Sequence, residues 1–149
     1  MSAGELCNRD VVVMEKGESV RDAARLMRDA HVGDIVVVEE RQGDRVPVGI
    51  VTDRDLVVGV MAASVDPDRL TVGDIMSLDL LTVREDEELL EAIPRMHTKG
   101  VRRIPVVDVA GALQGILSVD DMIELVAEQI SGLAALIRLE QRRERERRP

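Results

Sequence analysis

Two copies of one pattern fill most of the chain, and this duplication constrains the fold more than any other feature. When the sequence is shifted by 69 residues, nine of the 36 positions in 4–39 are identical to their partners. Further along, the offset is 66 and Asp55 meets Asp121. The three-residue difference falls in a polar segment, 40–45, which we expect to be a loop in a hairpin because loops tolerate insertions better than strands do.

Each copy has the hydrophobic pattern of a β-α-β-β-α unit, in which strands alternate with helices of apolar spacing three and four. The strands are predicted at 11–14, 35–38 and 48–51, and again at 80–83, 104–107 and 113–117. Gly4 and Gly73 are each interpreted as part of a turn into a copy. We therefore expect an α/β (α+β) fold with one repeat at 1–66, a second at 67–128 and a helical extension at 129–149.

The last helix is predicted to run far beyond the second repeat, because apolar residues keep a helical spacing from Met122 to Ile137. Ser131 and Gly132 interrupt this stripe. The tail from Arg138 onwards carries six arginines and three glutamates. We interpret the tail as a solvated helix face or a frayed end, and a nucleic-acid-binding arm is a less favoured alternative because the glutamates dilute its charge.

The chain of 149 residues contains no Phe, Tyr or Trp, although 45% of it is hydrophobic. This absence disfavours proteins that stack bases or cage methylated amines on aromatic rings. Any planar ligand must therefore lie between aliphatic side chains. The net charge of −9 disfavours nucleic-acid and anionic-membrane binding. A single cysteine, Cys7, and the lack of a signal peptide or a long apolar run predict a cytoplasmic protein that does not enter the membrane.

The strongest local motif is Gly, two apolar residues, a hydroxyl residue, two variable positions and Asp, which occurs at 49–55 and again at 115–121. One interpretation is a capping box, in which Thr52 and Asp55 satisfy backbone amides at a helix start. The other is a nucleotide site. The helix N-terminus would attract a phosphate, Thr52 would donate to it, Asp55 would accept from ribose hydroxyls, and the upstream glycine would let the ligand approach closely.

Taken together, the chain resembles a tandem cystathionine-β-synthase (CBS) domain pair over about residues 4–130. The matching features are the two motifs, Asp74-Ile75-Met76 and the segment 101–108. The resemblance implies two copies packed through their sheets into one module, and modules that associate in pairs. It also implies clefts between the copies that bind adenosine ligands such as AMP, ADP, ATP, NAD or S-adenosylmethionine.

The resemblance also implies a role for individual residues. Asp55 and Asp121 would hold ribose hydroxyls, and Thr52 and Ser118 would contact phosphate. The adenine would lie near the first strand and the start of the second strand, which gives Val13 and Ile35 in one cleft and Thr82, Ile104 and Pro105 in the other. Gly33 is a further candidate nucleotide-binding residue.

The two clefts are expected to differ, because Arg54 in the first motif is replaced by Asp120 in the second. Arginine neutralises phosphate and aspartate repels it, so we favour the Thr52 cleft for phosphorylated ligands. Arg102 and Arg103 belong to either cleft, or they are exposed charges at a strand start.

The sequence contains no constellation of catalytic or metal-ligating residues, and His31 and His97 are not equivalent in the repeat. We therefore expect a non-catalytic sensor with no catalytic cofactor. Its ligand would be an adenine nucleotide, with or without Mg²⁺, and it would relay occupancy through a homodimer to a separate target protein. The alternative is a dimeric protein-interaction scaffold whose clefts are vestigial.

Overall fold

The computed structural model describes residues 1–148 and divides the chain into two compact units, Met1–Leu117 and Ser118–Pro149. The first unit contains two three-stranded sheets with strand orders β1-β2-β3 and β4-β5-β6. The second unit consists of one long helix, α6 (Val119–Arg147). This mixed α/β architecture, with one sheet from each repeat, confirms the predicted fold class.

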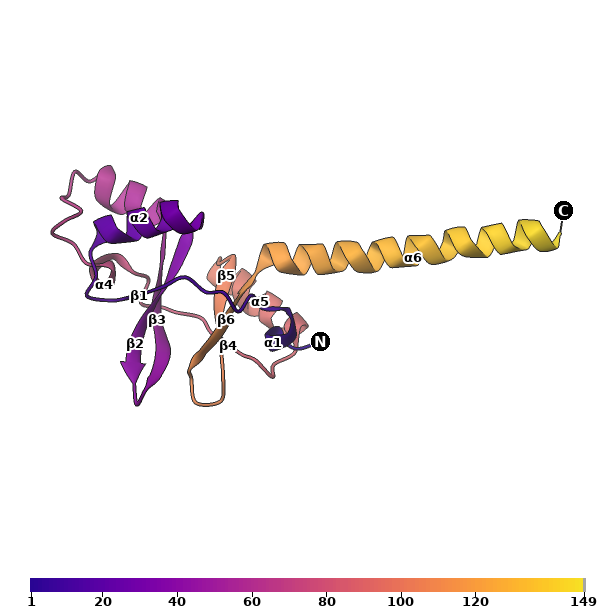
Figure 1. The fold of residues 1–149 in the computed structure, drawn as a ribbon, viewed down its shortest axis with the longest axis horizontal. Coiled ribbons are helices and arrows are strands. Elements are labelled where there is room, and N and C mark those ends of the chain that lie inside the picture. Colours follow the sequence, from indigo (N-terminus) through magenta and orange to yellow (C-terminus); the bar gives the residue numbers. More distant parts are fainter. Residues whose placement is uncertain (149) are drawn as a thin grey trace. The chain divides into compact units, whose positions relative to one another are not determined.

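The first sheet joins β1 (Val13–Glu15), β2 (Asp34–Arg41) and β3 (Asp44–Thr52). β1 runs parallel to β2, and β2 runs antiparallel to β3. The crossover between the parallel strands is α2 (Val20–Ala30), which contacts β2 and is seen above the sheet in Figure 1. α2 begins after Ser19, whose side chain accepts from the amide of Asp22, and it ends at His31 in the left-handed conformation.

The second sheet repeats this arrangement with β4 (Val83–Arg84), β5 (Arg103–Val107) and β6 (Leu113–Ser118). Its crossover helix is α5 (Leu89–Lys99), which contains Pro94 in its interior. The helix buries Leu89, Ala92 and Met96, at the spacing that the sequence predicts.

The β2–β3 hairpin is longer than the sequence suggested. Arg41 pairs with Asp44, so only Gln42 and Gly43 form the turn, and both have positive φ. Two positive φ angles are the signature of the type I′ turn, whose twist matches that of the flanking strands. The predicted loop at 40–45 is therefore wrong: the extra residues lengthen the strands instead.

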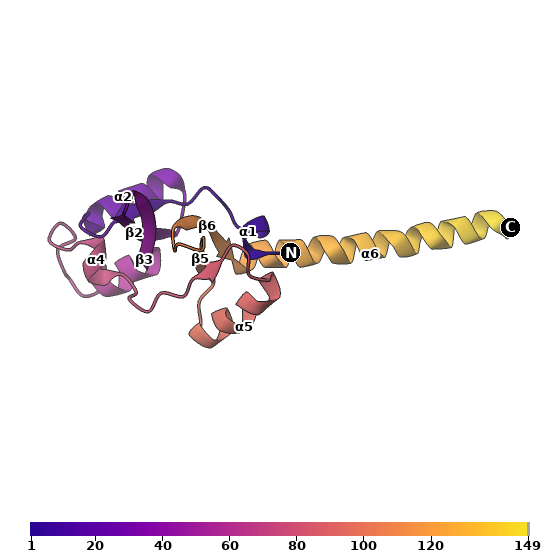
Figure 2. The same cartoon turned by 90° about the horizontal axis from the view of Figure 1, so that it is seen from below.

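Two one-turn helices, α1 (Ala3–Leu6) and α4 (Val72–Ile75), stand where turns were expected. Each packs against the other repeat's sheet. The amide of Gly4 in α1 donates to Glu85 beside β4, and the amide of Gly73 in α4 donates to Lys16 beside β1. Figures 1 and 2 both show α4 beside the first sheet and α1 beside the second. The two repeats therefore exchange their leading segments.

The helix that follows β3 begins with α3 (Asp53–Asp55) and continues as a π-helical segment, η1 (Leu56–Met61). Its counterpart in the second repeat is α6, which continues to Arg147, as the helical spacing predicted. α6 runs through Ser131 and Gly132 without a break, and Figure 2 shows it as one continuous helix. Among the residues that the structure describes, no helix is long and apolar enough to cross a membrane.

Candidate functional site

The Thr52 motif forms a complete capping box at the start of α3. The Asp55 amide donates to Thr52 Oγ1 at 3.2 Å, and the Thr52 amide donates to Asp55 Oδ2 at 2.8 Å. β3 ends at Thr52, so the strand delivers both side chains to the same corner of the sheet. The capping interpretation is confirmed, and any ligand role of these residues must coexist with it.

The backbone amides at this helix start are already occupied, which corrects the expectation that they would hold a phosphate. The Asp53 amide donates to the carbonyl of Gly33 at 2.9 Å, and the Arg54 amide donates to the Asp53 carboxylate at 2.8 Å. The third amide, on Asp55, is held by Thr52. Phosphate recognition here would depend on side chains, because a helix N-terminus attracts anions through amides that have no other partner.

Ser118 and Asp121 form the same capping box at the start of α6, with one difference in the hydroxyl group. Both backbone hydrogen bonds measure 3.1 Å. The Ser118 hydroxyl also donates to Asp121 Oδ2. Among the contacts of the described residues the Thr52 hydroxyl only accepts, so its proton is left for a ligand. The expectation that the Thr52 site suits phosphorylated ligands better stays a prediction.

A cavity of about 740 Å³ opens beside the Thr52 motif. Both repeats line it: the first contributes the start of β2 and the β3–α3 corner, and the second contributes the segments before β4 and β5. The lining residues are Gly33, Asp34, Ile50, Thr52, Asp53, Arg54, Asp55, Ser77, Asp79, Leu80, Leu81, Gly100, Val101, Arg102 and Arg103. The volume lies in the range of small-molecule sites, which hold their ligands between apolar side chains and a few polar groups.

The cavity lining contains an ion pair between the repeats. Arg103 Nε lies 2.9 Å from Asp34 Oδ2, and the Asp34 side chain is only 14% exposed. Burial raises the pKa of Asp34, Arg103 opposes this rise, and the Asp53 carboxylate adds to it. The raised pKa means that burial outweighs the attraction of the guanidinium.

Six of the predicted site residues line this cavity. They are Gly33, Thr52, Arg54, Asp55, Arg102 and Arg103. The two arginines that the sequence could not assign therefore lie on the Thr52 side.

The other predicted site residues lie outside the lining. Ile35, Ile104 and Pro105 are fully buried strand residues, and Val13 and Thr82 are half-buried. Ser118 and Asp121 belong to the second unit. Ligand contacts of these seven residues stay predictions.

Sequence reasoning missed the segment Ser77–Leu81, which supplies four lining residues. Ser77 forms an antiparallel bridge with Ile50 in β3, because α4 and the residues after it cross to the first sheet. The sequence did carry a signal in this segment. Leu80 and Leu81 are apolar, yet they lie outside β4, which is only two residues long, and so they are available to line a cavity.

Gly49 and Gly115 serve packing rather than ligand approach, which corrects their predicted role. A Cβ at Gly49 would lie 2.6 Å from Met76 Sδ, and a Cβ at Gly115 would lie 2.5 Å from Cys7 Sγ. The exchanged segments thus lie directly over the two glycines. Cys7 is buried at this contact, where its thiol packs as a small apolar group.

Comparison with known proteins assigns the class that this fold suggests. The family model for the CBS domain matches residues 3–61 and 72–128, so the chain belongs to the CBS domain family. An uncharacterized protein of Methanopyrus kandleri is 39% identical over 125 residues, which cover 84% of this chain and 62% of that protein. The chain thus spans less than two thirds of this relative's length.

Solved structures give the same assignment. The cytosolic domain of the Mg²⁺ channel MgtE in complex with ATP has a TM-score of 0.70 and 31% identity, and the match covers 83% of this chain and 48% of that chain. A CBS domain pair in complex with 5′-methylthioadenosine and S-adenosylmethionine has a TM-score of 0.74, at 21% identity, over 87% of this chain and 98% of that one, and shows the common fold. Proteins of this family are typically regulatory and bind adenosine ligands.

Proposed function

We propose that this chain is a non-catalytic regulatory module that binds an adenine nucleotide in the cavity beside Thr52. The observation that carries the proposal is that one cavity is lined by Asp55, a carboxylate able to accept hydrogen bonds from ribose hydroxyls, and by three arginines contributed by the two repeats. A ligand that touches both repeats can change their arrangement only if it binds one arrangement more tightly. Nucleotide occupancy would in this way be passed through a homodimer to a separate target protein.

The hydrogen bonds that Asp55 and Thr52 make in the capping box leave each of them an atom for the ligand. Asp55 holds the Thr52 amide with Oδ2, so Oδ1 would accept from a ribose hydroxyl. The Thr52 hydroxyl would donate to a phosphate, and Arg54 and Arg102 would neutralise it. The aliphatic side chains in the lining would sandwich the adenine, since the chain has no aromatic ring; these are Ile50, Leu80, Leu81 and Val101.

The similarity to the MgtE cytosolic domain supports ATP as one member of the ligand class, because that structure contains ATP and covers most of this chain. AMP, ADP, NAD and S-adenosylmethionine share the adenosine moiety, which the ribose acceptor and the aliphatic walls would recognise. Mg²⁺ would accompany the ligand only as a phosphate counter-ion. The cavity would supply binding and no chemistry.

The charge of the cavity favours a second candidate function, a dimeric interaction scaffold with a vestigial cleft. The lining holds four aspartates against three arginines, a formal charge of −1. One of those arginines, Arg103, is also engaged by Asp34. A cavity with this balance attracts a polyphosphate weakly, and a scaffold would have no need of one.

Isothermal titration calorimetry of the full chain with AMP, ADP, ATP, NAD and S-adenosylmethionine separates the two functions. We expect saturable binding of at least one nucleotide with one strong site per chain. No heat of binding at millimolar concentrations of all five ligands would reject the nucleotide module and leave the scaffold. Chromatography of the ligand after long incubation should return it unchanged, and turnover would refute the non-catalytic part.

The chain offers matched controls for the site. Thr71 and Asp74 form the same capping box at α4, with hydrogen bonds of 2.8 and 3.3 Å, and do not line the cavity. Asp55→Asn should weaken binding at least about 10-fold, which is about 1.4 kcal/mol. Asp74→Asn should leave it unchanged, and Asp121→Asn should have the smaller effect of the two motif variants. Equal losses for Asp55→Asn and Asp121→Asn would contradict the preference for the Thr52 cavity.

A further inference from the structure

Helix α6 has an exposed apolar stripe with the spacing of a coiled coil. Its members follow one another at intervals of three and four residues, which places them on one face of the helix. Each is more than half exposed: Ile123 61%, Val126 54%, Ile130 61%, Leu133 64% and Ile137 55%. An apolar face of this regularity in water indicates a helix that is completed by a partner.

The helix cannot owe its stability to backbone propensity alone. At 29 residues it is about 44 Å long, and isolated helices gain little free energy per residue in water. Gly132 adds a cost of roughly 1 kcal/mol relative to alanine. A Cβ at Gly132 would meet no atom within 4 Å, and by the heptad spacing Ser131 and Gly132 lie off the apolar face. The face itself is thus continuous.

The charges of α6 are separated along its length. The part from Val119 to Ile137 contains four acidic residues and no basic one, a charge of −4. The part from Arg138 to Arg148 contains six arginines and three glutamates, a charge of +3. Two such helices side by side in parallel would place acid beside acid and arginine beside arginine, whereas an antiparallel pair would place opposite charges together.

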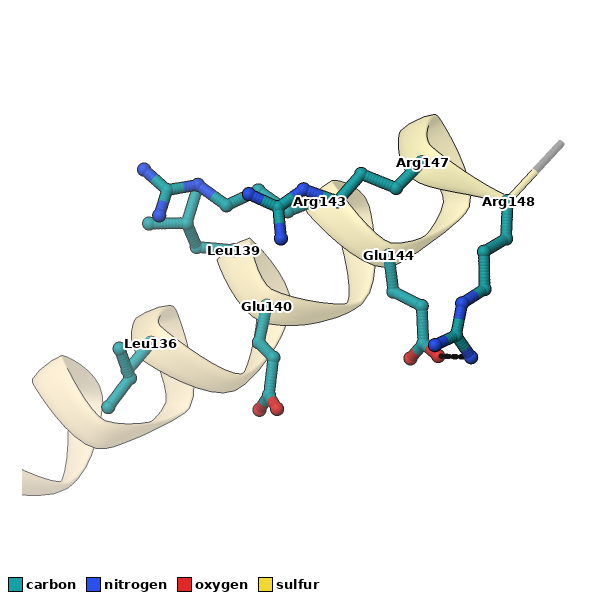
Figure 3. A pocket seen from close by; sticks show the side chains of 7 residues that line it. All are labelled: Leu136, Leu139, Glu140, Arg143, Glu144, Arg147 and Arg148. Carbon is teal, nitrogen blue, oxygen red and sulfur yellow. Dashed lines mark hydrogen bonds and ion pairs between the residues drawn. The ribbon is translucent and has the colours of Figure 1, made fainter.

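Figure 3 shows the C-terminal part of α6, where charged side chains follow apolar ones. Leu136 and Leu139 are followed by Glu140, Arg143 and Arg147 along the same single helix, with no opposite wall. Arg148 and Glu144 pair within the helix at 3.5 Å, while Arg143 and Arg147 point away from that pair in Figure 3. The arginine-rich end therefore has cationic groups that can reach an acidic neighbour.

We infer that α6 pairs with α6 of a second copy of this chain in an antiparallel coiled coil. The apolar stripes form the seam, and the arginine-rich end of each helix lies beside the acidic part of the other. Antiparallel pairing also opposes the two helix dipoles favourably. A two-fold axis between the helices lets each make the same contacts with the other, so the assembly closes as a dimer. The inference deepens the dimer part of the proposed function and does not depend on nucleotide binding.

The orientation is testable with spin labels on two matched glutamines that flank the seam, Gln129 and Gln141. Each is replaced by cysteine in a Cys7→Ala background of the full chain, labelled, and measured by double electron–electron resonance without nucleotide. Antiparallel pairing places the Gln129 labels close together and separates the Gln141 labels by roughly 30 Å or more along the axis. Short distances at both positions would mean parallel pairing, and no dipolar signal at either would mean no pairing; both outcomes overturn the inference.

The seam is tested separately with Leu133→Asp and Ala135→Asp, which add the same charge two residues apart. Both positions are exposed, so neither variant disturbs a buried core. Leu133→Asp should abolish the dipolar signal of the Gln129 label, and Ala135→Asp, on the outer face, should preserve it. Equal effects would contradict a seam at Leu133. Calorimetric titration of Leu133→Asp with ATP then separates helix pairing from nucleotide binding. If the variant no longer pairs but still binds ATP, the nucleotide site is intact and independent of the pairing of α6.

Discussion

Arg103 in β5 forms an ion pair with Asp34 in β2, with 2.9 Å between Nε and Oδ2, and this pair joins the two repeats within the cavity lining. The carboxylate occupies a guanidinium that a phosphate would otherwise attract. Burial raises the pKa of Asp34 despite this partner, so keeping the carboxylate ionised in the folded protein costs free energy. The pair therefore opposes phosphate binding while it holds the repeats together.

Asp34→Asn should strengthen the binding of ATP, because it removes a negative charge from the cavity lining. We expect the dissociation constant to fall by roughly 3- to 10-fold, which corresponds to about 1 kcal/mol. Adenosine has no phosphate, so its affinity should hardly change. Calorimetry of both ligands with Asp34→Asn, and with Asp22→Asn on the exposed face of α2 as the control, checks this prediction. Weaker ATP binding would show that Asp34 instead orients Arg103 for the ligand.

Arg103→Ala should make the stability of the fold depend on pH in the acidic range. Without the guanidinium the pKa of Asp34 rises further above its ordinary value of 3.8, so the folded state binds more protons than the unfolded state. Stability should then be greatest below the unfolded pKa and fall as the pH rises through the folded pKa. Urea unfolding at pH 4, 5, 6 and 7 should show this decline, relative to the wild type.

The matching control is the double variant Asp34→Asn/Arg103→Ala, which has no ionisable group at either position. Its unfolding free energy should lack the added pH dependence and recover part of the loss at pH 7, where an unpaired buried charge costs on the order of 1–3 kcal/mol. If the free energy of unfolding of Arg103→Ala and of the double variant depended on pH in the same way, Asp34 could not be the group that causes the added pH dependence.

Much of the fold was predictable because its signals are local. The duplication gave the order of elements, and the hydroxyl and acidic residues marked helix starts at Thr52 and Ser118, where both capping boxes occur. The hydrophobic period did not reveal α1 and α4, because a four-residue helix is too short to show one, although each follows a hydroxyl residue with an acid three positions later, at Ser2–Glu5 and Thr71–Asp74. Their exchange between the repeats is a tertiary arrangement that one sequence does not encode locally.

The candidate site was predictable in part for the same reason. Thr52, Arg54 and Asp55 follow one strand and were found from a single motif, whereas Ser77–Leu81 reach the cavity only through the exchange. Asp34 was passed over because its importance comes from Arg103, a residue 69 positions away in the chain. Long-range ion pairs leave no pattern in a single sequence.

The turn between β2 and β3 predicts a stabilising substitution. Gln42 has a φ of 53°, in the left-handed region, where asparagine is more favourable than glutamine. Gln42→Asn should therefore raise the free energy of unfolding by roughly 0.5 kcal/mol. Gly43 has a φ of 86°, so Gly43→Ala should lower it by roughly 1 kcal/mol. Urea denaturation measures both, and a destabilised Gln42→Asn would argue against the type I′ turn.

The exchanged segments predict unequal costs for two equivalent glycine substitutions. A Cβ at Gly115 would lie 2.8 Å from the carbonyl oxygen of Asn8, a backbone atom that also accepts the Ile116 amide. The three atoms nearest a Cβ at Gly49 all belong to the side chain of Met76, which is flexible and can move. Gly115→Ala should thus destabilise by roughly 2–3 kcal/mol and Gly49→Ala by roughly 1 kcal/mol.

Second-site variants of the opposing side chains complete this test. Met76→Ala removes the atoms nearest the new methyl group, so it should offset Gly49→Ala in the double variant. Cys7→Ala should offset Gly115→Ala only partly, because the Asn8 carbonyl oxygen remains in place. Urea unfolding of both cycles gives the coupling energies, which contacting residues show and distant ones do not. Full rescue of Gly115→Ala by Cys7→Ala would mean that the backbone of the N-terminal segment is free to shift, and that the exchanged segment is held over β6 by the cysteine side chain alone.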